Sequence, residues 1–258
     1  MDLVGRENVP IPDVSRLIRT DAAFTAEVLR LANSAMFGLR YEVVSILHAI
    51  SVLGMDRLKA LVLTVGMRDF LSGASQMELM KRCWRHNLAS ALSSEWLADY
   101  CRVDKSVAYT AGLLHDLGRL ALMMMNPAQY HELIRMVEET GQDIAECEKL
   151  AFGIDTCEAG VWVAQDWSLP AALREVICCH HQIPPAAACE LSLVAPLGCR
   201  VADSLGFTVM GPLPEDNHNW VRESLPADLW EKVETRLPEL YEMVPFKINL
   251  FECEFLNR

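Results

Sequence analysis

Apolar side chains recur at intervals of three and four residues along most of the chain, a spacing that predicts amphipathic helices. The first clear example follows Asp21, a favourable N-cap residue, and places Phe24, Val28, Leu31 and Ala32 on one face. The sequence therefore predicts a helix here that buries one side in a core.

The same spacing predicts helices over most of the remaining sequence, and Gly or Pro residues separate them. A stretch of small and polar residues, 71–76 (LSGASQ), predicts a loop. One short strand is predicted where Phe251, Cys253 and Phe255 alternate with glutamates. We expect helices at 43–53, around 58–65, at 77–100, from Asp104 to just before Pro127, at 131–140, 144–152 and 156–167, from Pro170 to before Pro184, and at 191–205.

These elements predict an all-α fold, and charge divides the chain into three parts. Residues 1–75 carry 8 acidic and 8 basic side chains, residues 76–210 carry 17 and 10, and residues 211–258 carry 10 and 5. We therefore predict a neutral N-terminal helical lobe (1–75), an acidic second helical lobe (76–210) and an acidic C-terminal extension (211–258) that is helical or irregular.

The net charge of −12 argues against partners that are themselves negatively charged. Nucleic acids and anionic membrane surfaces attract basic proteins and repel a chain of this charge. The longest stretch without Asp, Glu, Lys or Arg is residues 176–189, 14 residues, whereas a membrane span needs about 18 or more mostly apolar residues. Residues 1–10 lack the apolar segment of a signal peptide, and nine scattered cysteines are typical of buried, reduced thiols, so we expect a cytoplasmic protein.

The dipeptide His115-Asp116, within AGLLHDLGRL, is the sharpest local feature of the sequence. Ala108, Ala111 and Gly112 precede it on the same predicted helix and would let a neighbouring helix approach closely. Imidazole nitrogens and carboxylate oxygens bind divalent ions, and a metal between helices could activate water for attack on a phosphate ester. Further residues of these types are His86, His180, His181 and Asp203.

Each of these residues also has an ordinary structural explanation. A helical His beside small residues is more often hydrogen-bonded in a core than bound to a metal. His180-His181 could simply end a helix, where the helix dipole favours a protonated imidazole. Asp203 could be a surface residue, and the twelve methionines are typical of a core. Their order along the chain, from His86 to Asp203, favours a common site for these residues.

Longer motifs give this series a context. Residues 18–38 read IRTDAAFTAEVLRLANSAMFG, residues 44–54 read VSILHAISVLG, and residues 152–181 read FGIDTCEAGVWVAQDWSLPAALREVICCHH. Together with AGLLHDLGRL, they follow the order of motifs in the HDOD family, bacterial signalling domains related to the HD superfamily of metal-dependent phosphohydrolases. The chain resembles that family over about residues 10–210.

The resemblance implies two helical lobes, the second similar to catalytic HD domains, whose nearest examples are the HD-GYP phosphodiesterases of cyclic di-GMP. The metal ligands of those relatives correspond here to His86, His115, Asp116, His180, His181 and Asp203. Two further positions differ: Thr156 replaces a His of the motif G-x-D-H-x-E-x-G, and Arg82 replaces a Glu one turn before the first His. Arg119 stands where those enzymes have a Lys. A cation at residue 82 would repel a metal ion.

These differences favour a non-catalytic signal-transduction module, without catalytic residues, that binds a signalling protein partner or a small ligand. The alternative is a metal-dependent phosphohydrolase or phosphodiesterase with a reduced site. Such a site would hold one divalent ion (Fe, Mn, Zn or Mg) on His86, His115, Asp116 and Asp203. A third hypothesis is a buried hydrogen-bonded network that only stabilises the lobe, because an unpaired buried polar group costs about 1–3 kcal/mol.

Two regions stay open at this stage. The N-terminal lobe is a candidate partner surface, where we expect Asn33-Ser34 to shape a turn rather than to contact a ligand. Residues 211–258 could cover a cleft between the lobes, mediate oligomer formation or extend the core.

Overall fold

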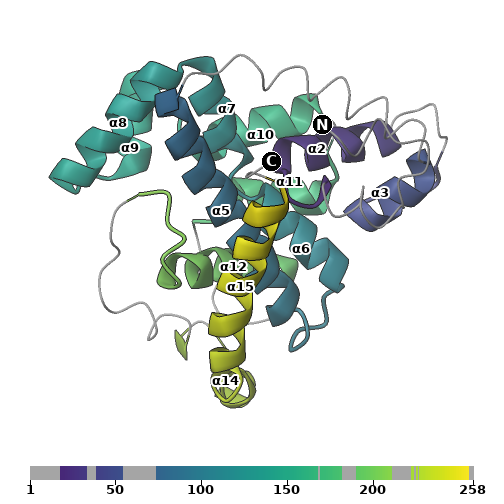
Figure 1. Ribbon diagram of the computed structural model, residues 1–258. Helices are drawn as coiled ribbons and strands as arrows, with labels where there is room; N and C mark the ends of the chain where they lie inside the picture. Colours follow the sequence, from purple (N-terminus) through teal and green to yellow (C-terminus); the bar gives the residue numbers. More distant parts are fainter. Residues whose placement is uncertain are drawn as a thin grey trace.

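A computed structural model describes residues 18–33, 39–54, 74–167, 169–181, 190–210, 222–223, 225 and 227–255. Within these ranges every regular element is an α-helix, which confirms the predicted all-α fold (Figure 1). The helices are α2 (Ala22–Ala32), α3 (Ile46–Leu53), α5 (Ala74–Leu97), α6 (Lys105–Leu114), α7 (Leu117–Met125), α8 (Pro127–Thr140), α9 (Ile144–Phe152), α10 (Thr156–Asp166), α11 (Ala171–Cys179), α12 (Leu191–Ser204), α14 (Ala227–Glu234) and α15 (Leu237–Phe255).

Helix α5 lies at the centre of the arrangement and packs along α6, α12 and α15 (Figure 1). Its contacts with α6 and α12 are close because glycines meet serines there. A Cβ atom added to Gly112 would lie 2.6 Å from Ser94 Oγ and 2.7 Å from Ser90 O. A Cβ atom on Gly198 of α12 would collide with the same Ser94 hydroxyl. The small residues before His115 therefore admit a neighbouring helix, as their pattern predicts.

The N-terminal helices α2 and α3 pack against α6, and hydrogen bonds tie the end of α2 to Val43, shortly before α3. The side chain of Asn33 donates to Leu29 O at 3.0 Å and to Val43 O at 2.9 Å, and its Oδ1 accepts from Val43 N at 2.7 Å. Asn33 thus has the structural role that the sequence predicts, whereas Ser34 lies outside the described residues.

We expect Asn33→Ala to lower the free energy of unfolding by about 1–3 kcal/mol, because the backbone groups of buried Val43 lose their partners. Urea denaturation followed by circular dichroism measures the change. Asn33→Asp keeps the oxygen that accepts from Val43 N, but it turns a second acceptor oxygen toward the carbonyls of Leu29 and Val43, so it should lose at least as much. Equal, negligible losses in both variants would contradict the role given to Asn33.

Several predicted boundaries are wrong. The single helix expected from Asp104 to just before Pro127 is two helices, and His115 and Asp116 form the junction between α6 and α7. Asp116 leaves the helical conformation, with φ −103° and ψ 29°. Part of the loop expected at 71–76 is helical from Ala74, and the helix expected at 43–53 begins at Ile46 with Ser45 as N-cap. The helix expected around 58–65 lies outside the described residues.

The predicted strand at 251–255 is also wrong, since these residues continue α15. Leu240, Val244 and Ile248 are fully buried at four-residue intervals, so the helical register is set before the alternating segment begins. The division of the chain at residues 75 and 210 stays a prediction.

The thiols only partly match the expectation that they are reduced. Cys101 is disulfide-bonded, which corrects that expectation at this position. In the described part of the chain, the free cysteines are Cys83, Cys147, Cys157, Cys178, Cys179 and Cys199. None of the described helices combines the length and apolar character needed to cross a membrane.

Candidate functional site

The fold gathers most of the predicted site residues around one buried centre. His86 comes from the middle of α5, His115 and Asp116 from the junction of α6 and α7, His180 from the end of α11, and Asp203 from α12. All but Asp203 are nearly inaccessible to solvent, and Asp203 is mostly covered. The close approach of α5, α6 and α12 is what brings these positions together.

The three buried imidazoles are oriented by backbone carbonyls. Because a carbonyl oxygen only accepts hydrogen bonds, each Nδ1 that contacts one carries a proton, and the neutral ring then presents an unprotonated Nε2. The contacts are His86 Nδ1 to Phe207 O at 2.7 Å, His115 Nδ1 to Gly112 O at 2.7 Å and His180 Nδ1 to Ile177 O at 3.0 Å. Carbonyl-anchored rings of this kind are typical of metal-binding histidines.

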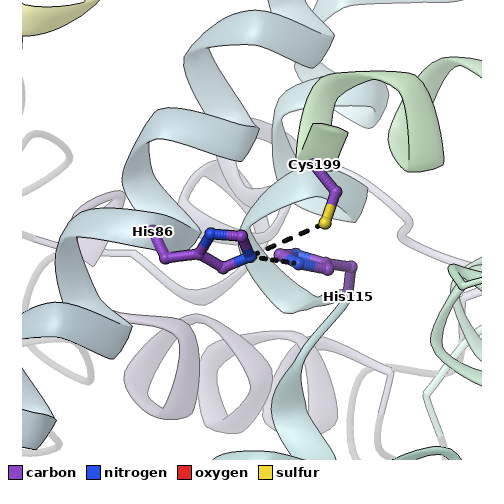
Figure 2. Close-up of side chains that lie close together, drawn as sticks. All are labelled: His86, His115 and Cys199. Atoms are coloured by element: carbon purple, nitrogen blue, oxygen red, sulfur yellow. Dashed lines mark hydrogen bonds between the residues drawn. The ribbon is translucent and has the colours of Figure 1, made fainter. Parts of the chain in front are cut away.

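The Nε2 atoms converge on the centre. Those of His86 and His115 lie 3.1 Å apart (Figure 2). His180 Nε2 lies 3.8 Å from Asp116 Oδ1, and both atoms are buried without a hydrogen-bond partner. Burial, and secondarily His86, lower the pKa of His115 to about 3, and burial with His181 lowers the pKa of His180. These two imidazoles are therefore neutral and free to bind a cation.

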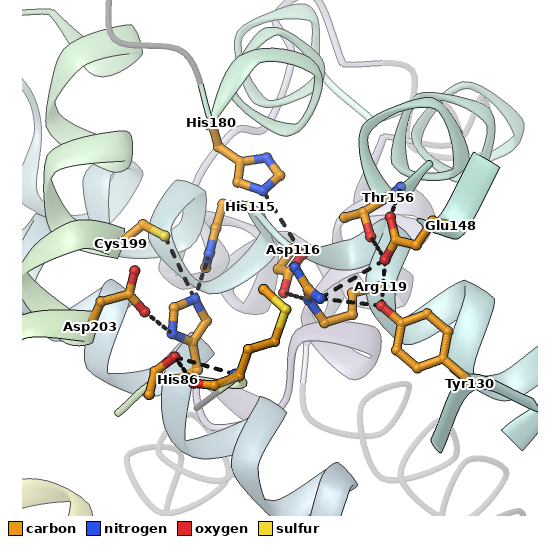
Figure 3. A network of polar contacts seen from close by, with 12 residues as sticks. His86, His115, Asp116, Arg119, Tyr130, Glu148, Thr156, His180, Cys199 and Asp203 are labelled. Atoms are coloured by element: carbon orange, nitrogen blue, oxygen red, sulfur yellow. Dashed lines mark hydrogen bonds and ion pairs between the residues drawn. The ribbon is translucent and has the colours of Figure 1, made fainter. Parts of the chain in front are cut away.

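Asp116 is held by a buried cation of the protein itself. Its Oδ2 accepts from Arg119 Nε at 2.5 Å, and both side chains are almost fully buried (Figure 3). Burial alone would raise the pKa of Asp116, but Arg119 and the nearby imidazoles outweigh it, so the pKa lies well below its ordinary value. The carboxylate is ionised, with one oxygen paired and the other free.

The Arg119 guanidinium belongs to a longer chain of polar contacts. Its Nη1 donates to Tyr130 OH at 3.2 Å, and that hydroxyl donates to Glu148 Oε1 at 2.5 Å. Glu148 also accepts from the backbone N–H and the hydroxyl of Thr156, each at 2.7 Å (Figure 3). We call this set, Asp116, Arg119, Tyr130, Glu148 and Thr156, the arginine network.

Tyr130 and Glu148 were not predicted from the sequence as members of the site. A signal for Glu148 does exist, since it lies four residues after Ile144 and one after buried Cys147, on the apolar face of α9. A charged residue at such a position is buried only with a partner. Nothing in the sequence identifies that partner as Arg119.

Three other predicted positions lie differently from the expectation. His181 is exposed beside His180, and its ligand atom groups with His180 and Cys157 rather than with His86. Asp203 Oδ1 lies 3.4 Å from His86 Nδ1, on the side of the ring away from Nε2, so it helps to orient that ring. Arg82 pairs with Glu138 at 2.5 Å on the surface, so its charge is neutralised there.

Cys199 also lies at this centre, although no sequence motif marked it as a candidate ligand. Its Sγ lies 3.6 Å from His86 Nε2 (Figure 2). Cys199 is one turn before Asp203 on α12 (Figure 3). Burial and the Asp203 carboxylate raise the pKa of the Cys199 thiol well above its usual value. Without a nearby cation this side chain is therefore a neutral thiol.

These residues fit one metal ion and do not fit two. Two of the ligand atoms, Asp116 Oδ1 and His180 Nε2, are buried without a hydrogen-bond partner, while the Nε2 atoms of His86 and His115 contact each other. Oxygen and nitrogen donors of this kind suit a divalent ion. A second ion beside Asp116 would meet the Arg119 guanidinium on Oδ2. Thr156 stands where the related enzymes have a metal-binding His, and its hydroxyl donates to Glu148 instead of facing an ion.

Comparisons with known proteins identify the family and the fold of the chain. A family model, the HDOD domain, matches residues 1–183. An uncharacterised protein of Treponema pallidum (strain Nichols) is 26% identical over 185 residues, which is 71% of this chain and only 36% of that protein. The chain thus corresponds to about a third of that relative's length.

Two crystal structures share the fold. The MmoQ response regulator of Methylococcus capsulatus str. Bath superposes with a TM-score of 0.67 at 24% identity, over 85% of this chain and 92% of that one. An HDOD domain protein of unknown function from Geobacter sulfurreducens gives a TM-score of 0.50 at 22% identity, over 94% of this chain and 88% of that one. At these identities the likeness concerns the fold alone.

Proposed function

The chain belongs to the HDOD family, and from that membership we propose that it is a signal-transduction module that acts by binding a protein partner or a small ligand rather than by hydrolysis. One observation carries the proposal: Arg119 is paired with Asp116 inside the buried centre. Both charges are satisfied by the protein itself.

The position of Arg119 matters because of what a two-metal phosphoesterase needs. In such enzymes two cations stabilise the attacking and the leaving oxygens, and a carboxylate holds both. In this chain one oxygen of Asp116 is committed to a guanidinium that cannot be deprotonated. The arginine network fixes that guanidinium from the other side through Tyr130 and Glu148.

A second candidate function is a phosphohydrolase with a single ion. The unpaired Asp116 Oδ1 and His180 Nε2 favour it, because buried polar atoms without partners are uncommon in proteins. A bound ion would supply an activated water for attack on a phosphate ester. In that case Asp116 Oδ1 and His180 Nε2 would hold the ion, and Arg119 would keep Asp116 ionised and oriented.

The two candidates are distinguished by turnover. With Mn²⁺, Fe²⁺ or Zn²⁺ supplied, we expect the chain to hydrolyse bis(p-nitrophenyl) phosphate and cyclic di-GMP no faster than its Asp116→Ala variant. Arg135→Met, which alters an exposed arginine on α8, is the control for handling and purity. Metal-dependent turnover that Asp116→Ala abolishes and Arg135→Met keeps would reject the non-catalytic proposal.

The binding half of the proposal has its own test. We expect a pull-down with the tagged chain to retain a protein that excess untagged chain displaces. Failure to find any displaceable protein or small ligand, in a preparation shown to be folded by circular dichroism, would count against it.

A further inference from the structure

We propose that His86, His115 and Cys199 form a binding site for a thiolate-preferring divalent ion, with Zn²⁺ as the best fit. The inference goes beyond the proposed function, because such an ion could serve a module that never turns over a substrate. Their ligand atoms lie within 4.8 Å of one another, and all three side chains are buried (Figure 2).

The two imidazoles make a contact that a metal ion between them would explain. His86 Nε2 and His115 Nε2 lie 3.1 Å apart, although the protons of both rings are committed to carbonyls through Nδ1. As neutral rings they would face each other lone pair to lone pair, away from water. A proton or a metal ion must lie between them for the contact to be attractive, and a metal ion can satisfy both rings while they stay neutral.

The separations between the ligand atoms also match those around a tetrahedral zinc ion. Zinc binds nitrogen at 2.0–2.1 Å and sulfur at about 2.3 Å in a tetrahedron, which places neighbouring ligands about 3.3 Å (N to N) and about 3.6 Å (N to S) apart. The corresponding separations here are 3.1 Å between the two Nε2 atoms and 3.6 Å between His86 Nε2 and Cys199 Sγ. The side chains therefore stand close to ligand geometry without rearrangement.

The sulfur of Cys199 indicates which kind of ion the site prefers. A thiolate selects zinc over Mg²⁺, which prefers oxygen ligands. Of the ions that the sequence allows, Cys199 therefore favours Zn²⁺.

A second group of ligand atoms, Cys157, His180 and His181, is the competing location. We favour the first group for two reasons. Cys157 and His181 are more exposed, and His180 turns its Nε2 toward Asp116. The experiment separates the two groups through their different cysteines.

Cobalt substitution tests the site without any assay of activity. We expect the chain, freed of metal by a chelator and loaded with Co²⁺, to show a thiolate-to-cobalt charge-transfer band in the near ultraviolet. The band should vanish in Cys199→Ser and persist in Cys157→Ser. It should also persist in Cys147→Ser, which alters an equally buried free thiol of α9. In Zn²⁺ titrations, Cys199→Ser should bind more than about 100-fold more weakly, because losing only a group that orients a ligand already costs 10–100-fold.

Three results would overturn the proposal. A band lost in Cys157→Ser and kept in Cys199→Ser would place the ion in the competing group. Cobalt bound without a thiolate band would mean a site of His and carboxylate alone. Absence of Co²⁺ and Zn²⁺ binding by the folded parent chain would remove the site altogether. If Cys199→Ser does not fold, Cys199→Ala and the parent spectrum still decide the question, and none of these results bears on the turnover test above.

Discussion

Arg119→Met is expected to lower the free energy of unfolding by about 3–5 kcal/mol, the usual cost of leaving a buried charge without its partner. The substitution removes the guanidinium that pairs with Asp116 and bonds to Tyr130, and it leaves two buried carboxylates, Asp116 and Glu148, facing a neutral side chain. Methionine fills a similar volume, so lost packing contributes little. Urea denaturation followed by circular dichroism measures the loss.

Arg135→Met is the matched control. Arg135 on α8 also pairs with two carboxylates, those of Glu132 and Glu139, but all three side chains are more than half exposed. Its removal should cost no more than about 1 kcal/mol, since exposed ion pairs contribute little. If the two variants lost similar amounts of unfolding free energy, the arginine network would contribute no more to stability than an exposed ion pair does.

The Arg119→Met variant also tests whether Arg119 keeps a second metal ion away from Asp116. Without the guanidinium, Asp116 Oδ2 is free, and millimolar Mn²⁺ should raise the melting temperature of Arg119→Met more than that of the parent chain. An ion that binds the folded state alone stabilises it by mass action, by about 2.7 kcal/mol at 100 times its Kd. An equal response of the two proteins to Mn²⁺ would show that Arg119 does not occupy a cation position.

Gly118→Ala is the second large effect that we expect. Alanine is favoured over glycine in a helix by about 1 kcal/mol, so substitution at an open helical position would stabilise the protein. Here the added Cβ atom would collide with the backbone of Thr156 and would lie 2.9 Å from Gly160 Cα. Backbone cannot move aside as a side chain can, so we expect a net loss of more than about 3 kcal/mol, at the upper end of overpacking costs.

Calorimetric melting temperatures measure this loss, and Met124→Ala is the control on the same helix. Met124 is 57% exposed on α7, and its truncation should change the free energy of unfolding by less than about 0.5 kcal/mol. A Gly118→Ala variant as stable as the control would mean that α7 and α10 are farther apart than the structure places them. The junction at His115-Asp116 would then lose its explanation as well.

That junction shows where helical periodicity stops being informative. The apolar spacing of Ala108, Ala111, Leu114 and Leu117 fits one continuous helix, because it records which side is buried and not whether the axis bends. The axis bends at Asp116, after which the backbone of Gly118 lies against α10. The residues of α10 that Gly118 meets, Thr156 and Gly160, are 38 and 42 positions away in sequence, so local spacing could not reveal the bend.

The candidate site was predictable where a residue is both chemically distinctive and part of an ordered motif. His86, His115, Asp116, His180 and Asp203 meet both conditions, and the fold gathers them. Cys199 and Glu148 meet neither condition, because a lone cysteine and a glutamate in a helix are ordinary residues. Their role comes only from their neighbours, His86 at 3.6 Å and Thr156 at 2.7 Å.

The all-α class, the N-caps at Asp21 and Asp104, and the order of the ligand-type residues could be predicted from the sequence, because helix periodicity, capping and motif order are local properties of a chain. Which charged groups meet depends on how the helices pack against one another and could not be predicted. Whether Arg119 faces solvent or Asp116, and whether Cys199 lies in a plain core or beside two unprotonated nitrogens, depends on how α5, α7 and α12 pack. Ion pairs and metal–ligand contacts form only between groups a few ångströms apart. Two residues that are this close in space can be more than a hundred positions apart in sequence, as His86 and Cys199 are.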